Sequence, residues 1–175
     1  SLVGSEMCKR DSPDSPWLNK IKMANQESND GSINQQSFVK SIKKYVLVAN
    51  NPITIQTADK QHKIFLNYWK AITNILGIEE PTVLFKYNGV ELFCKFSVPF
   101  FNKMINMPDF KVSTMQSLLE QAFEEVEGDY AGVGHTDFWT KGSTASFLNS
   151  GALNVINAEM VKALHKTNFQ RDIEI

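Results

Sequence analysis

The chain has 175 residues, of which 42% are hydrophobic and 21% charged, and its formal net charge is -1 at pH 7. These values suit one folded domain and exclude a disordered or collagen-like chain. No apolar run reaches the roughly 18 residues that a membrane-spanning helix needs. The near-neutral charge also excludes a strongly basic domain that would bind nucleic acid through its bulk charge alone.

The residue pattern divides the chain into an extended N-terminal segment, residues 1–34, and a helical domain, residues 35–170. The first segment is polar, and its one alternating run, LNKIKM, predicts an edge strand or a small β-hairpin, a two-stranded appendage at most. The start SLVGSEMCKR has no apolar signal-peptide core and no initial Met. We therefore expect an excised piece of a longer protein, with Ser1–Leu2 left from cloning.

Apolar residues at steps of three and four predict the first two helices of the domain. The first covers residues 35–46 and is stopped by Asn50, Asn51 and Pro52. The second carries Trp69 on its apolar face and ends at Gly77, where a helix-terminating glycine belongs. Because Trp69 lies in the middle of this face, we expect it to be largely buried.

Three further helices are predicted in the second half of the chain. Residues 83–105 are apolar enough for a buried helix with a break near Asn88–Gly89 and a bend before Pro99, although Val83 to Tyr87 could instead be extended. Ser113 or Thr114 is expected to cap the next helix, which Gly128 ends. The last helix is expected over residues 144–165, broken near Ser150–Gly151. Together the helices predict a mainly α, multi-helix fold.

Positive charge is concentrated in the first half of the chain. Residues 1–78 hold ten Lys/Arg against six Asp/Glu, a balance of +4, and residues 79–175 hold eight against thirteen, a balance of -5. Two groups of lysines stand out. The first is Lys40, Lys43 and Lys44, and the second, on the outer side of the Trp69 helix, is Lys60, Lys63 and Lys70, of which Lys60 and Lys63 are chosen with the first group as the basic face. Such lysines could neutralise DNA phosphates. The other interpretation is an ordinary solvated helix face, since Lys is a common exposed helix former.

The glycine-rich stretch of residues 128–142 is predicted to be a loop with a functional or a docking role. His135, Asp137 and Asp129 are of types that bind metals. They would serve a metal-dependent nuclease-like or nucleotide-hydrolysing enzyme. The other interpretation is that these polar side chains stabilise turns. In Lys141 to Thr144, KGST, the Lys precedes the Gly and no glycine stands five residues earlier after a strand, so the run does not form a phosphate-binding loop. Ser143 or Thr144 is expected to cap the last helix.

Nucleophilic catalysis finds no support in the sequence. Cys8 and Cys94 belong to no spaced Cys/His pattern, which predicts free thiols in a reducing compartment, the cytoplasm. Ser146 stands in no nucleophile motif, and the sequence has no G-x-S-x-G elbow. We expect no cofactor, and the sequence does not specify an oligomeric state.

Several runs of residues resemble DGQHR-domain proteins, the bacterial group that includes the DNA sulfur-modification DndB family. They are SPDSPWLNKIKM with SINQQSFVKSIKKYV, FLNYWKAITNIL, VLFKYNGVELF and DFWTKGSTASFLNSGALNVINAEMVKAL. The resemblance covers roughly residues 10–165 and implies the C-terminal part of such a protein, without its ParB-like N-terminal half. Asp59 to Lys63, DKQHK, echoes the DGQHR motif but replaces its Gly and its Arg, and it reads as a polar helix start.

The resemblance implies a non-catalytic module linked to DNA modification or defence. Its expected partners are DNA, through Lys40, Lys43, Lys44, Lys60 and Lys63, or the missing N-terminal half of the same protein. Two alternatives stay open: the metal-dependent enzyme domain and a module for protein–protein interaction.

Overall fold

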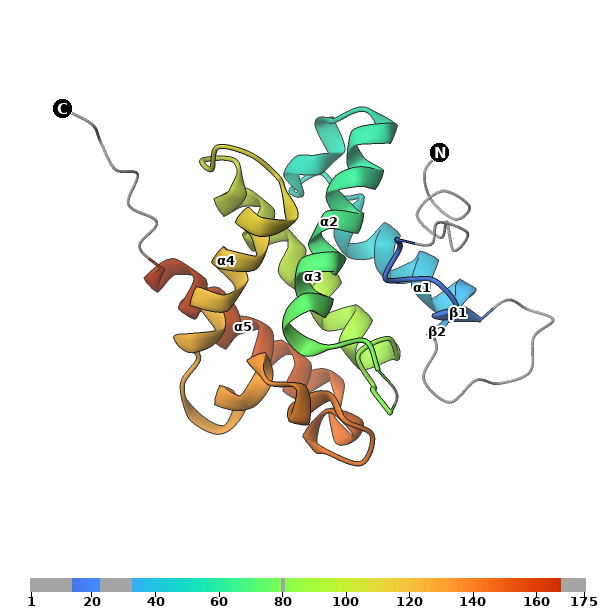
Figure 1. Ribbon diagram of the computed structural model, residues 1–175, viewed down its shortest axis with the longest axis vertical. Helices are drawn as coiled ribbons and strands as arrows, with labels where there is room; N and C mark the ends of the chain where they lie inside the picture. Colours follow the sequence, from blue (N-terminus) through green and yellow to red (C-terminus); the bar gives the residue numbers. More distant parts are fainter. Residues whose placement is uncertain (1–13, 23–32, 80, 168–175) are drawn as a thin grey trace.

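In the computed structural model (Figure 1), helices make up most of the described chain, which comprises residues 14–22, 33–79 and 81–167. The α-helices are α1 (Gln35–Ser41), α2 (Ala58–Leu76), α3 (Tyr87–Met104), α4 (Val112–Glu124) and α5 (Ser150–Lys166). Between them lie a π-helical turn, η1 (Ile42–Val46), and the 3-10 turns η2 (Pro52–Ile55), η3 (Gly128–Gly134), η4 (Thr136–Trp139) and η5 (Thr144–Phe147). The mainly α fold predicted from the sequence is confirmed.

Two short strands near the N-terminus pair in parallel. They are β1 (Ile21–Lys22) and β2 (Ile33–Asn34), with Ile21 opposite Ile33. A hairpin requires antiparallel strands, so the hairpin alternative is wrong. Ile21 and Ile33 are both buried in the hydrophobic core, so the strand pair is part of the domain rather than an appendage.

The helices pack around one hydrophobic core. α4 lies against α2 and α5, and α3 lies against α1 and α5. Trp69 on α2 is fully buried, as its place on the apolar face predicts. Gly77 ends α2 with a φ of 84°, a left-handed conformation that glycine adopts without strain. No helix among the described residues is long and apolar enough to cross a membrane.

The start of α3 corrects the expected break near Asn88–Gly89. The helix begins at Tyr87 and runs through Pro99 to Met104, so these two residues form its first turn. A Cβ atom at position 89 would lie 2.0 Å from the carbonyl oxygen of Leu84. The glycine is therefore explained by the close approach of the preceding loop and not by a helix break.

The starts of α4 and α5 also differ from the prediction. α4 begins at Val112, where Asp109 accepts hydrogen bonds from Lys111 N at 2.9 Å and from Thr114 Oγ1 at 2.7 Å. α5 begins at Ser150, and its cap is Asn149, which accepts from Ala152 N at 2.8 Å. Predicted caps at Ser113 or Thr114 and at Ser143 or Thr144 are therefore wrong. The expected break near Ser150 corresponds to the gap between η5 and α5.

The glycine-rich stretch folds as consecutive 3-10 turns that dock on the core. Val133 and Trp139 are buried, and Trp139 Nε1 donates to the carbonyl of Val133 at 2.8 Å. Thr82 forms an isolated antiparallel bridge with Thr140, which joins this stretch to the segment that precedes α3. The stretch therefore packs against the rest of the domain, and its predicted functional or docking role stays a prediction.

Candidate functional site

Lys40, Lys43 and Lys44 lie at the end of α1 and in η1. All three side chains are exposed, and together with Gln36 and Val39 they line a shallow hollow. Positions three and four apart on a helix share one face, so the charges of this α1–η1 lysine surface point the same way. A hydrogen bond to Tyr45 raises the pKa of Lys44, so this side chain stays charged at neutral pH.

The surroundings of the α1–η1 lysine surface contain little negative charge. The sequence has no Asp or Glu between residues 31 and 58. Among the described residues, no ion pair involves any of the three lysines. Among the described residues, the carboxylate that acts on this surface is the buried Glu91, near Lys44. The surface therefore presents three exposed cations that form no ion pair with a described residue, an arrangement that attracts anions.

Lys60 and Lys63 lie in a different environment, in the first two turns of α2. Lys63 Nζ forms an ion pair with Asp59 at 3.0 Å. Both lysines line a pocket of about 470 Å³ formed by η2, the first half of α2, Ile105 and Phe110. The five predicted lysines are therefore all exposed, but they line two distinct hollows rather than one.

The DKQHK run lies in the first two turns of α2, as expected of a polar helix start.

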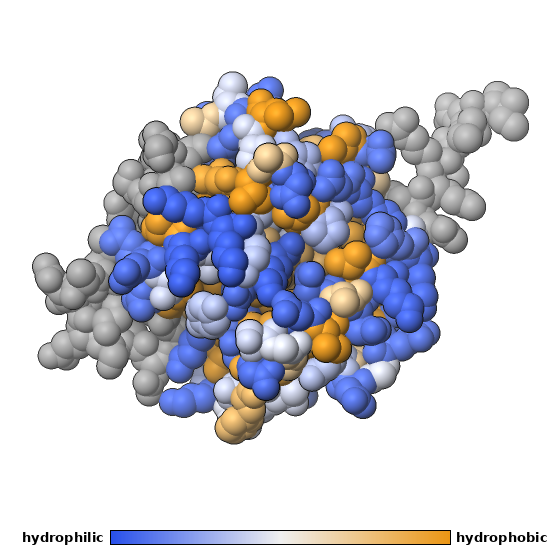
Figure 2. Space-filling model, turned by 180° about the vertical axis from the view of Figure 1, so that it is seen from behind, coloured by the Kyte–Doolittle hydropathy of each residue, from blue (hydrophilic) through white to orange (hydrophobic). Residues whose placement is uncertain are grey.

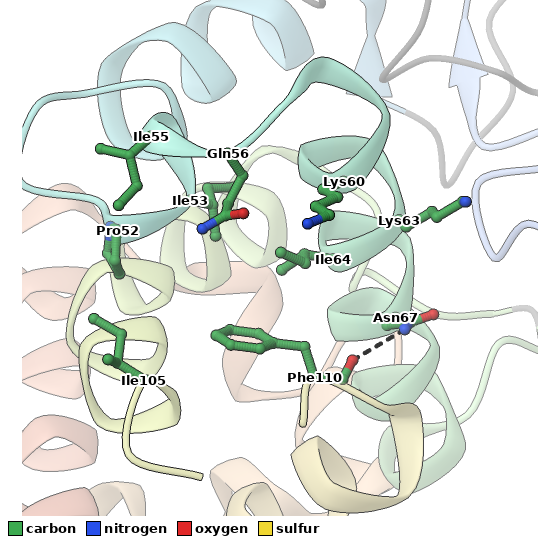
Figure 3. A pocket seen from close by; sticks show the side chains of 10 residues that line it. All are labelled: Pro52, Ile53, Ile55, Gln56, Lys60, Lys63, Ile64, Asn67, Ile105 and Phe110. Atoms are coloured by element: carbon green, nitrogen blue, oxygen red, sulfur yellow. Dashed lines mark hydrogen bonds between the residues drawn. The ribbon is translucent and has the colours of Figure 1, made fainter. Parts of the chain in front are cut away.

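Figure 3 shows how the side chains of this pocket are arranged. Ile64 and the ring of Phe110 point into its centre, and the polar ends of Lys60 and Gln56 are directed inwards above them. The amino group of Lys63 points away from the pocket. One cation therefore faces an otherwise largely apolar cavity.

Amide side chains fasten the walls of this pocket to one another. Gln61 Nε2 donates to the carbonyls of Thr54 at 3.1 Å and Gln56 at 3.0 Å, which ties η2 to α2. Asn67 Nδ2 donates to the carbonyl of Phe110 at 3.0 Å. These bonds hold the pocket in shape without a ligand, as is usual for small-molecule sites.

Ile55 and Ile105 are exposed at the edge of the pocket, with 85% and 55% of their surfaces accessible. On the face seen in Figure 2, hydrophobic residues form separate small groups between hydrophilic ones. Isolated exposed apolar side chains are common on soluble proteins. A pair of them at the mouth of one apolar pocket is more informative, because a bound molecule would cover both.

A buried carboxylate lies between η1 and α3. Glu91 is buried on α3, and its Oε1 accepts a hydrogen bond from the hydroxyl of Tyr45 at 2.9 Å. A hydrogen bond with the same carboxylate raises the pKa of Tyr87 to about 12. Burial raises the pKa of Tyr45, so both phenols stay protonated near neutral pH. The cluster links η1 to α3 and holds the α1–η1 lysine surface in place.

The candidates for a metal site and for a nucleophile do not form catalytic groups. Asp129 lies on η3, His135 between η3 and η4, and Asp137 on η4, and all three are exposed. Within the described ranges, no three or more His, Cys, Asp and Glu side chains come together to hold a metal. Burial raises the pKa of Cys94 well above its usual range, and Cys8 lies outside the described residues.

The KGST run serves the turn in which it lies. Ser143 Oγ donates to the carbonyl of Phe138 at 2.6 Å, and Ser146 Oγ accepts from Gly142 N at 2.8 Å. These hydrogen bonds within the turn occupy the side-chain oxygens of both serines.

Comparison of the chain with protein-family models, with curated proteins and with solved structures found no match. The function of the lysine-lined hollow and of the apolar pocket is therefore inferred from the residues that line them.

The apolar pocket was not predicted from the sequence. Its lining comes from residues 52–56, 60–67 and 105–110, and no helical or strand period connects segments so far apart.

Proposed function

We propose that this chain is a non-catalytic binding module that contacts the phosphates of duplex DNA through the α1–η1 lysine surface. The observation that carries the proposal is the presence of three exposed lysines on one face of a segment without acidic residues. Lysine side chains bind DNA by replacing the counterions condensed on its phosphates. A module that uses only a few such contacts needs no strongly basic composition, which agrees with a net charge of -1.

The two lysine groups contribute unequally to this proposal. Lys40, Lys43 and Lys44 are its core because they share one face. Lys63 contributes less, since Asp59 already pairs with it at 3.0 Å. Lys60 contributes least, since its amino group is directed into the apolar pocket. The proposal therefore narrows the five lysines chosen from the sequence to three.

The cellular role follows from the resemblance to DGQHR-domain proteins and rests on that resemblance alone. The module would act in DNA modification or defence, next to a ParB-like N-terminal half of the same protein. Docking of that half is the alternative use of the same charged surface. An enzymatic role has less support, because the candidate metal ligands form no group among the described residues.

A salt-dependent binding measurement tests the proposal. The protein is titrated into a fluorescently labelled duplex, and anisotropy is recorded at several salt concentrations. Three phosphate contacts predict that log K falls with log salt with a slope of about -2.7. A complete lack of binding at low salt, or a slope near zero, would remove DNA from the proposal and leave a protein-interaction module.

A further inference from the structure

The pocket beside η2 has a composition that suits a ligand other than DNA. Its centre is formed by apolar side chains, chiefly Ile53, Ile64 and Phe110, and one amino group, that of Lys60, is directed into it (Figure 3). A phosphate backbone carries no apolar surface to fill such a centre. The volume of about 470 Å³ lies within the range of small-molecule sites.

We propose that this pocket binds a small apolar acid, that is, a single carboxylate attached to a hydrocarbon body of medium length. The hydrocarbon would lie against Ile64 and Phe110, and the carboxylate would accept a hydrogen bond from the amino group of Lys60. Gln56, whose amide is directed to the same side of the pocket, would donate a second hydrogen bond.

The charge around the pocket favours an acid over a neutral or a basic ligand. No Asp or Glu is among the lining residues. The one acidic side chain in the first turn of α2, Asp59, is occupied by Lys63. Among the described residues Lys60 has no side-chain partner, so its charge is available to a ligand. The N-terminus of α2 adds the positive end of a helix dipole.

The apolar part of the ligand follows from the exposed side chains at the mouth. Ile55 and Ile105 remain 85% and 55% accessible, although each lines the pocket. When a hydrocarbon covers these side chains, apolar surface of both the protein and the ligand is removed from water. This burial supplies most of the affinity of a small apolar ligand. A short hydrophilic acid such as acetate would leave both side chains exposed.

Titration with sodium octanoate, followed by NMR of isoleucine methyl groups, tests this inference. Four isoleucines line the pocket, and they are Ile53, Ile55, Ile64 and Ile105. We expect saturable shifts of these four methyl signals, with Ile72 and Ile156 of the buried core unchanged. Octanol and octylamine are the neutral and cationic counterparts, and we expect both to bind about tenfold weaker, the loss of one charge-assisted hydrogen bond.

Two lysine variants give a matched comparison. Lys60→Gln is expected to weaken octanoate binding about tenfold, and Lys162→Gln, which removes the same charge from an exposed side chain that does not line the pocket, is expected to change it less than about twofold. Ile55→Asp places a negative charge at the mouth on a side chain that is already exposed, so it should abolish binding without unfolding the protein.

Three results would overturn the inference. They are equal binding of octanol and octanoate, equal effects of the two lysine variants, and methyl shifts spread over the core rather than confined to the four pocket isoleucines. Because the DNA measurement depends on Lys40, Lys43 and Lys44, either proposal can fail without the other.

Discussion

Trp17 and Trp69 meet edge to face, with their ring centroids 4.7 Å apart and their planes at 72°. Phe38 and Phe85 complete the contact with Trp17, at centroid distances of 4.6 Å and 5.1 Å. Residues 14–20 therefore insert a fully buried indole between α1, α2 and the loop before α3. The described part of the N-terminal segment is thus tied to the centre of the helical core.

Replacing either tryptophan should destabilise the fold strongly. Trp17→Ala and Trp69→Ala are each expected to lower the free energy of unfolding by about 3 to 5 kcal/mol, since each removes a buried aromatic side chain and leaves a cavity. Urea denaturation measures this loss. Ile55→Ala, at an exposed position, is the control and should stay within about 0.5 kcal/mol. A Trp69→Ala variant that melts within a degree or two of the parent would contradict this description of the core.

The glycine-rich stretch offers a second test of packing. A Cβ atom at position 134 would lie 2.5 Å from Cβ of Phe123 on α4, so Gly134→Ala should cost about 1 to 3 kcal/mol by overpacking. At Gly132 the nearest atom would be 3.9 Å away, on Phe138, and Gly132→Ala should cost much less. Thermal melts of the two variants check the difference. Equal melting temperatures would mean that η3 does not dock on α4 as described.

Helices were predicted correctly where the local sequence pattern was strong. α2 has an uninterrupted apolar stripe and a terminal glycine, and its face and its end were predicted correctly. The starts of α4 and α5 were wrong because several polar residues compete as caps near each start. Asp109 and Asn149 make the observed hydrogen bonds, and the sequence alone does not rank them above Ser113 or Ser143.

Features that depend on distant segments were not predictable. Gly89 suggested a helix break because its contact with the backbone of Leu84 is visible only in three dimensions. Trp17 received no role, since nothing in a polar, proline-containing segment indicates that one indole enters the core. For the lysines, the sequence correctly indicated exposure. The sequence could not show that the amino group of Lys60 is directed into a pocket, because that pocket is formed partly by Phe110, which is distant in the sequence.

Buried tyrosine and cysteine side chains predict a loss of stability at high pH. Burial raises the pKa of Tyr68 well above its ordinary value of 10.0, and burial also raises that of Cys94 above 9.0. The folded chain therefore keeps protons that the unfolded chain loses. Stability should be unaffected by these groups below about pH 9 and should fall as the pH rises further.

Tyr68→Phe separates the contribution of this residue from the others. The hydroxyl of Tyr68 donates to the carbonyl of Phe93 at 2.7 Å, so the variant should lose about 1 kcal/mol at pH 7. Above pH 10 its stability should fall less steeply than that of the parent, because one of the groups with a raised pKa is gone. Urea midpoints measured at pH 7, 9, 10 and 11 test this, and parallel pH profiles would rule out the assigned role.

The proposal that Lys40, Lys43 and Lys44 bind duplex DNA is tested most directly by the salt slope of two triple variants. In one, these three lysines become Gln; in the other, Lys111, Lys141 and Lys162 become Gln, which changes the net charge equally on exposed positions of the second half of the chain. The first variant should bind more weakly, with a slope reduced by about one for each lysine. The second should keep the slope of the parent, whereas equal slopes for the two variants would contradict a specific DNA-binding surface on α1 and η1.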